Sequence, residues 1–361
     1  MLRRCFYIFD DYIINKRIFV LTVKFHIVTK DNLCYIFTIN IGAGMNMKLK
    51  EINKEIRLEG AFYKAISPLG IEKVQRAVGP LSTKMMSVLS LSHLNCEKVK
   101  IPRGNGTLMR TCIMKGEKTS GKTVGILWLH GGGYSLGAPE MAIMTLPRYL
   151  VKNCNCVVVS PDYTLSTIKP YPAALNDAYT ALKWVNEHKS ELGITADKIV
   201  VGGESAGGGL ATALCLYARD KGDTSIGFHI PLYPMLDDRV TITSAHNTAP
   251  VWGTNENKSA WHIYLGDRVM NNSVEPYAAP ARADNLKNMP PAFSIVGTAD
   301  PFYAETKKYF ERMKKSGVPC ELTEYNGCFH AFDMMVPYAK ISKKASLHLI
   351  DKYKEYCKKY I

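Results

Sequence analysis

The chain has 361 residues, 47% of them hydrophobic, which is long for one domain and apolar enough for a large core. Its formal net charge of +14 raises the question of nucleic acid or acidic membrane surfaces as partners. Because the lysines are spread along the whole chain and no nucleic-acid-binding motif accompanies them, we expect neither nucleic acid nor a membrane as partner.

The ten cysteines form no clear metal-binding pattern, because there is no C-x-x-C pair and no matching histidine spacing. Cys112, Cys156 and Cys215 stand among apolar residues and are expected to pack in the core. Since no signal peptide is evident, we expect reduced thiols and a cytoplasmic location.

Residues 1–44 differ from the rest of the chain, with basic residues scattered among aromatic and β-branched ones. The longest apolar stretch there, 18–23, is too short to span a bilayer. One hypothesis is an over-extended gene start, with Met45 or Met47 as the true first residue, because the composition changes abruptly at 42–44. The alternative hypothesis is a peripheral membrane-anchoring arm.

From Met47 onward the apolar period becomes helical. The residues spaced for one helix face are Leu49, Ile52, Ile56, Leu58 and Phe62. Further helices are expected over 71–78 and 81–91. We therefore predict an N-terminal helical cap segment over 45–95 and a main domain over 96–361.

The main domain reads as apolar strands and amphipathic helices. Strands are predicted at 96–101, 108–114, 124–129, 156–160, 198–202, 229–233, 292–297 and 320–325, and helices at 141–152, 172–189, 205–219 and 340–359. A polar insertion over 237–276 carries Trp252, Trp261, His262 and Tyr264. We expect it to complete the cap and to line a substrate pocket, with its aromatic residues serving in packing.

Residues 203–207, which read Gly-Glu-Ser-Ala-Gly, connect the predicted strand at 198–202 to a helix of small residues. A strand, a G-x-S-x-G sequence and a helix in this order are typical of a nucleophile elbow, a tight turn that exposes the serine hydroxyl. The alternative interpretation is a glycine-rich turn in which Ser205 only caps the next helix.

A serine nucleophile needs hydrogen-bond donors for the oxyanion that forms. Glycines follow the strand at 124–129 in the sequence His130-Gly131-Gly132-Gly133. We assign the backbone N–H groups of Gly132, Gly133 and Ala206 as donors, and His130 as a residue that orients the loop. A flexible loop or a phosphate cradle would also use glycines, but no G-x-x-x-x-G-K-[ST] sequence is present.

The serine also needs a base and a residue that orients the base, in the chain order Ser, Asp, His. Asp300 follows the predicted strand at 292–297, and His330 follows the one at 320–325. Open α/β sheets bind their ligands at the carboxyl ends of their strands, where both residues are expected. We therefore predict a catalytic group of Ser205, His330 and Asp300.

With these motifs the chain resembles the hormone-sensitive-lipase-like branch of the α/β-hydrolases, which includes many bacterial carboxylesterases. The resemblance covers roughly residues 90–360 and includes the runs at 130–137, 203–208, 300–302 and 329–332. It implies an α/β-hydrolase fold, with an eight-stranded, mostly parallel sheet, helices on both faces and a helical cap. It also implies hydrolysis of short- to medium-chain acyl esters without a cofactor or metal, with Ser205 as nucleophile, His330 as base and Asp300 as its partner.

The chain departs from this family at several positions. Glu204 replaces the aspartate that usually precedes the serine, and Ala331 replaces the usual glycine after the histidine. The common run Asp-Tyr-Arg-Leu-Ala-Pro-Glu appears over 162–168 without its arginine and glutamate. We expect this loss to remove charges beside the oxyanion loop and to change loop support or substrate choice. We expect His130, Gly131, Asp162 and Glu204 to support the site without taking part in the chemistry.

The sequence thus predicts a serine carboxylesterase acting on a small-molecule ester. The same three residues can also cleave an amide, a lactone or a carbamate, which sequence alone separates poorly. A third alternative is a non-catalytic, ligand-binding protein with this fold. A homodimer through the strand at 320–325 is suggested by fold analogy.

Overall fold

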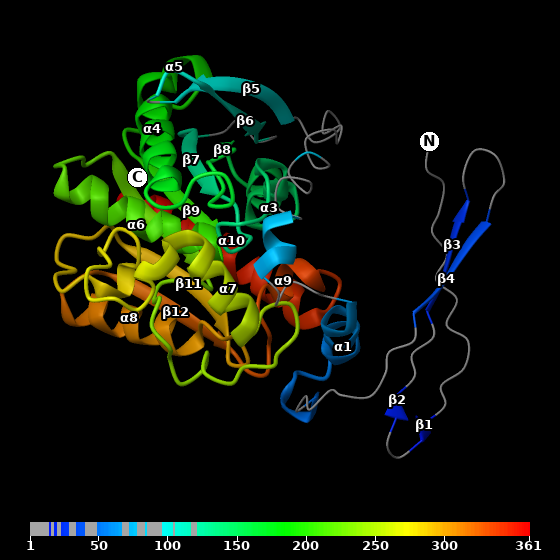
Figure 1. Ribbon diagram of the computed structural model, residues 1–361. Coiled ribbons are helices and arrows are strands. Elements are labelled where there is room, and N and C mark those ends of the chain that lie inside the picture. The colour runs from blue at the N-terminus through cyan, green and yellow to red at the C-terminus, as the bar shows by residue number, and fades with distance from the viewer. Residues whose placement is uncertain are drawn as a thin grey trace. The chain divides into compact units, whose positions relative to one another are not determined.

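The computed structural model describes residues 14–15, 18–19, 23–28, 34–39, 49–66, 72–77, 84, 96–103, 105–116 and 121–361. The chain divides into two compact units, Met1–Lys48 and Leu49–Ile361 (Figure 1). In the first unit, β1 (Ile14–Asn15) pairs antiparallel with β2 (Ile18–Phe19), and β3 (Val23–Val28) with β4 (Cys34–Ile39). The true start of the chain and the anchoring role of this segment stay hypotheses.

The second unit contains an eight-stranded sheet in the order β12-β11-β10-β9-β7-β8-β6-β5. The strands are β5 (Cys96–Pro102), β6 (Leu108–Lys115), β7 (Val124–Leu129), β8 (Cys156–Pro161), β9 (Ile199–Glu204), β10 (Ile226–Leu232), β11 (Ala292–Gly297) and β12 (Cys320–Tyr325). In this sheet β6 is antiparallel to both β5 and β8, and the other neighbouring pairs of strands are parallel. The predicted α/β fold with a mostly parallel sheet is confirmed.

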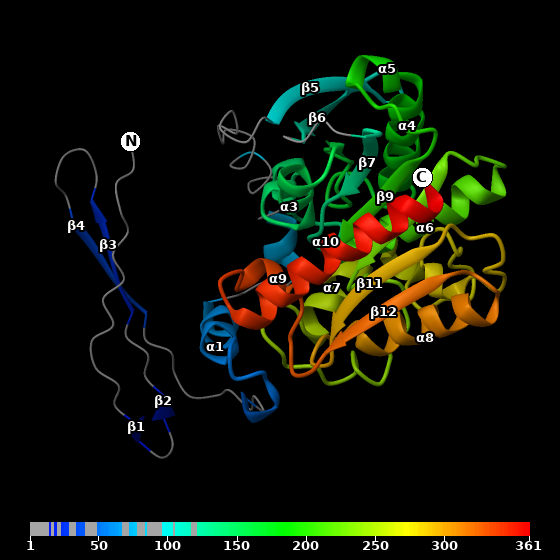
Figure 2. The same ribbon diagram turned by 180° about the vertical axis from the view of Figure 1, so that it is seen from behind.

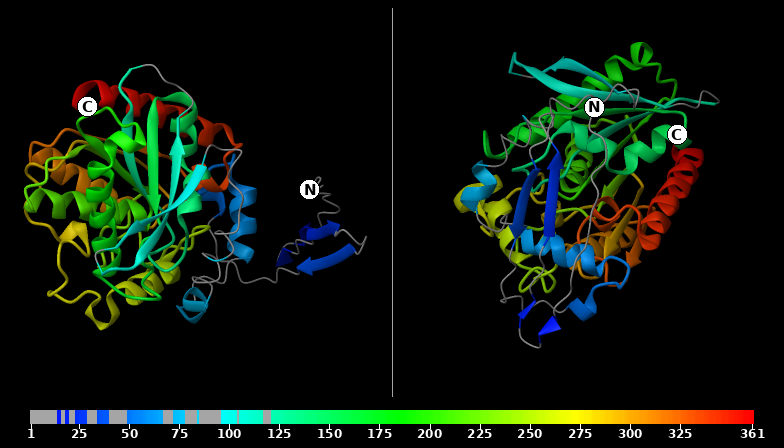
Figure 3. Two further views of the ribbon diagram at one scale, coloured as in Figure 1. Left: turned by 90° about the horizontal axis from the view of Figure 1, so that it is seen from above. Right: turned by 90° about the vertical axis from the view of Figure 1, so that its right-hand side faces the viewer.

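Helices cover both faces of the sheet, as Figures 1 and 2 show from opposite sides. The helices are η1 (Leu49–Glu51), α1 (Arg57–Ile66), η3 (Pro139–Ile143), α3 (Leu146–Asn153), α4 (Ala173–Glu187), α5 (Lys189–Leu192), α6 (Ala206–Asp220), α7 (Thr254–Leu265), η4 (Gly266–Arg268), η5 (Pro280–Arg282), α8 (Tyr303–Lys315), α9 (Phe332–Met335) and α10 (Lys340–Tyr360). Figure 3 shows the twisted sheet between the two layers.

Each face of the sheet has its own hydrophobic core. Along β7, Leu127 and Leu129 belong to the core under α4, α6 and α8, whereas Ile126 and Trp128 belong to the core under α3 and α10. This alternation follows from the two-residue period of a strand. Because both faces are covered, every residue of β7 is buried, and the central strands read as continuous apolar runs.

The N-terminal helical prediction is partly wrong. Ile52 and Ile56 are buried as expected, but Leu58 is 71% exposed. The reason is that the α-helix begins only at Arg57, so the spacing counted from Leu49 does not continue through one helix. Residues 72–77 are helical, and of the predicted helix at 81–91 only Lys84 lies within the described residues. The extent of the cap segment therefore stays a prediction.

Two other helices have different limits from those predicted. The helix expected at 141–152 is divided into η3 and α3. The helix expected at 172–189 ends at Glu187, and the short α5 follows it. Cys112, Cys156 and Cys215 are buried as predicted. No helix in the described ranges is both long and apolar enough to cross a bilayer.

The turn from β9 to α6 lies against the end of β7. A Cβ atom on Gly207 would be 2.0 Å from the carbonyl oxygen of Leu129, and one on Gly203 would be 2.4 Å from the same oxygen. Ser205, between them, has φ 58° and ψ −122°, a strained backbone for a residue with a side chain. The glycines of this turn are therefore required by close backbone packing.

Replacing Gly207 by alanine should lower the free energy of unfolding by about 3 kcal/mol, because the new methyl group meets backbone atoms that cannot move aside. Alanine is intrinsically the better helix residue by about 1 kcal/mol, so propensity alone predicts the opposite sign. Unfolding of the variant in denaturant distinguishes the steric effect from the propensity effect by the sign of the change in unfolding free energy. Gly222→Ala is the control for losing a glycine without a clash: nothing lies within 4 Å of the added atom, and the φ of +76°, which strains alanine, should cost only about 1 kcal/mol.

Candidate active site

Ser205, His330 and Asp300 come together at the carboxyl ends of β9, β12 and β11. The Nε2 atom of His330 lies 2.8 Å from the Oγ atom of Ser205, and its Nδ1 atom lies 2.8 Å from Oδ2 of Asp300. All three side chains are buried, and Ser205 retains 6% exposure. The predicted residues therefore form one continuous hydrogen-bonded chain.

The chemistry of Asp300 sets the tautomer of His330. A carboxylate only accepts hydrogen bonds, so Nδ1 carries the proton and Nε2 is left to accept the Ser205 hydroxyl. The other carboxylate oxygen of Asp300 accepts the backbone N–H of Phe302 at 2.8 Å, which holds the carboxylate in place. His330 is thus oriented to take a proton from Ser205.

Three aromatic rings surround the imidazole. The ring centroids of Phe302, Tyr233 and Trp252 lie 5.0, 5.1 and 6.2 Å from that of His330. They restrict water around the imidazole, and Trp252 comes from the predicted insertion. Sequence reasoning selected none of the three as a site residue, and for Trp252 the reason was that aromatic residues of the insertion were expected to serve in packing.

The loop at 130–133 presents backbone donors beside Ser205. Gly132 and Gly133 have φ angles of +110° and +59°, which glycine adopts without strain. No residue in the described part of the chain accepts a hydrogen bond from the N–H of Gly132, Gly133 or Ala206. Ala206 is also the first residue of α6, where the helix dipole favours negative charge.

Glu204 ties this loop to the sheet. Its Oε1 accepts the Gly131 N–H at 3.0 Å, and its Oε2 accepts the Trp128 indole N–H at 2.6 Å. Burial raises the pKa of the Glu204 carboxyl to about 7, although both hydrogen bonds oppose the rise. The longer glutamate side chain therefore reaches two donors on different elements, which is a structural use for the unusual residue at this position.

His130 is enclosed behind the same loop. Its Nδ1 donates to the Gly131 carbonyl at 2.8 Å, and its ring stacks on Tyr163 with centroids 4.2 Å apart. The Tyr163 hydroxyl donates to the His130 carbonyl at 2.8 Å. Burial lowers the pKa of His130 to about 4, so the ring is neutral near pH 7. These contacts suit a residue that orients the loop.

Arginine side chains lie beside Asp162 and Asp177 although the family's arginine is missing from 162–168, and the expected change in loop support or substrate choice stays a prediction. Thr164 stands where the family has its arginine, and Arg103 donates to the Thr164 hydroxyl at 2.6 Å and pairs with Asp177. Arg110, on β6, pairs with Asp162 at 3.0 Å. Sequence reasoning missed both arginines, because the pairing of β6 with β8 brings Arg110 across from a segment 52 residues away.

The α/β hydrolase fold family matches residues 126–334, which is more than half of the chain. The chain belongs to this family. It lies in the hormone-sensitive-lipase-like branch, and several of its curated relatives are named esterases.

Individual relatives support the assignment of this chain to the α/β-hydrolase family. The chain is 33% identical to the esterase LipI of Mycobacterium tuberculosis over 223 residues, which are 61% of this chain and 68% of that protein. It is also 33% identical to the carboxylesterase NlhH of the same species, over 59% of this chain and 69% of that protein. Its structure resembles that of a bacterial heroin esterase with a TM-score of 0.74 and 27% identity, covering 86% of this chain and 99% of that one.

The raised pKa of Glu204 predicts a pH-dependent stability difference. An unperturbed glutamate ionises near pH 4.5, so the folded hydrolase holds a proton that the unfolded chain releases between pH 4.5 and about 7. This contribution to stability is present at low pH and is lost as the pH rises through 7. Glu204→Gln removes the titration, so the stability of the wild type relative to this variant should fall by about 2 kcal/mol between pH 5 and pH 8.

Urea unfolding at the two pH values measures this change. Glu311→Gln makes the same substitution at an exposed position of α8 and is the control for the change of residue type. If the stability difference between the wild type and Glu204→Gln is the same at both pH values, Glu204 is ionised at both and the prediction is wrong.

Proposed function

We propose that this α/β-hydrolase is a serine carboxylesterase for short- to medium-chain acyl esters, with Ser205 as nucleophile, His330 as general base and Asp300 as its orienting partner. The observation that carries the proposal is the chain of two 2.8 Å hydrogen bonds that links these side chains. The N–H groups of Gly132, Gly133 and Ala206, which have no acceptor among the described residues, support it.

In the first half of the reaction, His330 takes the Ser205 proton as the hydroxyl attacks the ester carbonyl carbon. The resulting oxyanion lies within reach of the N–H groups of Gly132, Gly133 and Ala206, which stabilise it. Asp300 stabilises the imidazolium. The protonated imidazole then gives its proton to the leaving alcohol, and an acyl-enzyme remains.

In the second half, His330 takes a proton from water as the water attacks the acyl-enzyme, and Ser205 is restored when the acid leaves. Water must enter a site where Ser205 is almost fully buried. The Trp252 ring lies against the loop, because a Cβ on Gly133 would be 2.6 Å from it. This crowding supports a preference for short acyl groups over long ones.

The first experiment is hydrolysis of p-nitrophenyl esters of increasing acyl length. We expect the wild type to prefer short esters, and Ser205→Ala to lose on the order of 10⁶ in kcat, down to background. Ser346→Ala removes a buried hydroxyl from α10, far from the nucleophile in the chain, and should leave kcat within twofold.

Two results would contradict the proposal. Activity retained by Ser205→Ala would exclude this serine as the nucleophile. A folded wild type that turns over no ester would shift the assignment to amides, lactones or carbamates, or to a ligand-binding role.

A further inference from the structure

The insertion after β10 lines a cavity that is open to solvent. Its volume is about 460 Å³, within the range of small-molecule sites, and every residue that lines it falls between 238 and 270. None of Ser205, Asp300 and His330 lines it. The cavity lies on α7, a helix whose Ala260 contacts Gly133, so α7 stands between the cavity and the oxyanion loop.

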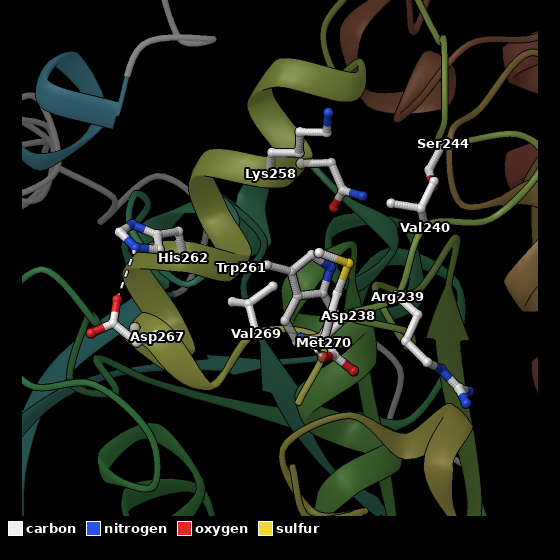
Figure 4. A pocket seen from close by; sticks show the side chains of 12 residues that line it. Asp238, Arg239, Val240, Ser244, Lys258, Trp261, His262, Asp267, Val269 and Met270 are labelled. Carbon is white, nitrogen blue, oxygen red and sulfur yellow. Dashed lines mark hydrogen bonds and ion pairs between the residues drawn. The ribbon is translucent and has the colours of Figure 1, made fainter. Parts of the chain in front are cut away.

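One part of the lining is apolar. Figure 4 shows Trp261, Val269 and Met270 grouped around the lower part of the cavity, with Val240 on the loop opposite. Trp261 is buried, whereas Met270 is 57% exposed and Val240 is 55% exposed. Two large apolar side chains exposed at the edge of one cavity are suited to contact an alkyl chain.

The charges of the lining are unevenly compensated. Asp238 is neutralised by two hydrogen bonds from Arg282 and one from the Met270 N–H. Arg239 pairs with Asp237 outside the lining, and Asp267 lies against His262 at the other end of the cavity (Figure 4). Within the described residues the Lys258 ammonium makes no ion pair.

Buried polar atoms beside Lys258 also lack partners. The indole N–H of Trp261 and the Oδ1 atom of Asn257 have no hydrogen-bond partner in the described part of the chain, and both residues line the cavity and are more than nine-tenths buried. An indole N–H can only donate a hydrogen bond, so its partner must be an acceptor. The Asn257 amide can present its oxygen or its nitrogen, since the two are assigned from their neighbours. Both atoms are closed off from the cavity, so the exposed Lys258 ammonium is the group of the lining that is suited to an anionic oxygen.

We propose that this cavity binds an amphiphilic carboxylate, such as a medium-chain fatty acid anion, with the alkyl chain on Trp261, Val269 and Met270 and the carboxylate at Lys258. The site is separate from the active site and is independent of the proposed esterase activity. The net charge of +14 raises the local concentration of anions around the molecule, which assists their capture.

The test is calorimetric titration of the full chain with octanoate. We expect saturable binding with one site on the insertion. Acetate, which lacks the alkyl chain, and octanol, which lacks the charge, should each bind several-fold more weakly, because both halves of the ligand contribute.

Two variants locate the binding. Lys258→Gln removes the cation and should raise the Kd about fivefold. Met270→Asn removes the apolar edge and should raise it several-fold, while asparagine tolerates the φ of 60° at this position, so the fold is preserved. Lys344→Gln makes the same change of net charge on the exposed surface of α10 and should leave the Kd unchanged.

The proposal fails if octanoate does not bind at millimolar concentration, or if the Kd is unchanged in either cavity variant. It also fails if Lys344→Gln weakens binding as much as Lys258→Gln, since attraction would then reflect net charge alone. Because no turnover is measured, loss of ester hydrolysis in other experiments leaves this result unaffected.

Discussion

The close approach of the β9–α6 turn to the end of β7 is the constraint on which the site depends. The Leu129 carbonyl lies where side chains of both Gly203 and Gly207 would have to be, and the next residue, His130, begins the glycine loop. One backbone contact therefore sets the position of the Ser205 hydroxyl relative to the Gly132 and Gly133 amides. Geometry fixed by packed backbone is stiffer than geometry held by flexible side chains, which suits a site that must hold a developing charge.

The polar groups around this contact are buried, so their partners decide whether the arrangement is stable. An unpaired buried polar group costs about 1–3 kcal/mol, and a charged one costs more. Glu204, Asp300 and the Nδ1 atom of His130 have partners on another element or the adjoining backbone. These bonds link β7, β9, β11 and the loop after β12, so the site is held by the sheet as a whole.

The buried carboxylates of Asp162 and Asp177 need a cation beside them, and residues from different parts of the chain can supply it. The family places an arginine two residues after this aspartate, whereas here Thr164 occupies that position and bonds Asp177. Arg103, directly after β5, and Arg110, on β6, bring guanidinium groups to the same place. Since Asp162 and Asp177 are largely buried, each would be costly without a cation beside it. The departure from the family motif is therefore balanced by residues outside it.

The sequence by itself determined the strands, the G-x-S-x-G turn and the order of Ser205, Asp300 and His330, because each depends on patterns a few residues long. Only the tertiary structure decided which distant residues meet. Trp252 and Tyr233 beside His330, and Arg110 beside Asp162, follow from the order and register of the strands, which no local pattern records. The exposure of Leu58 has the same cause, since the limits of a helix depend on what it packs against.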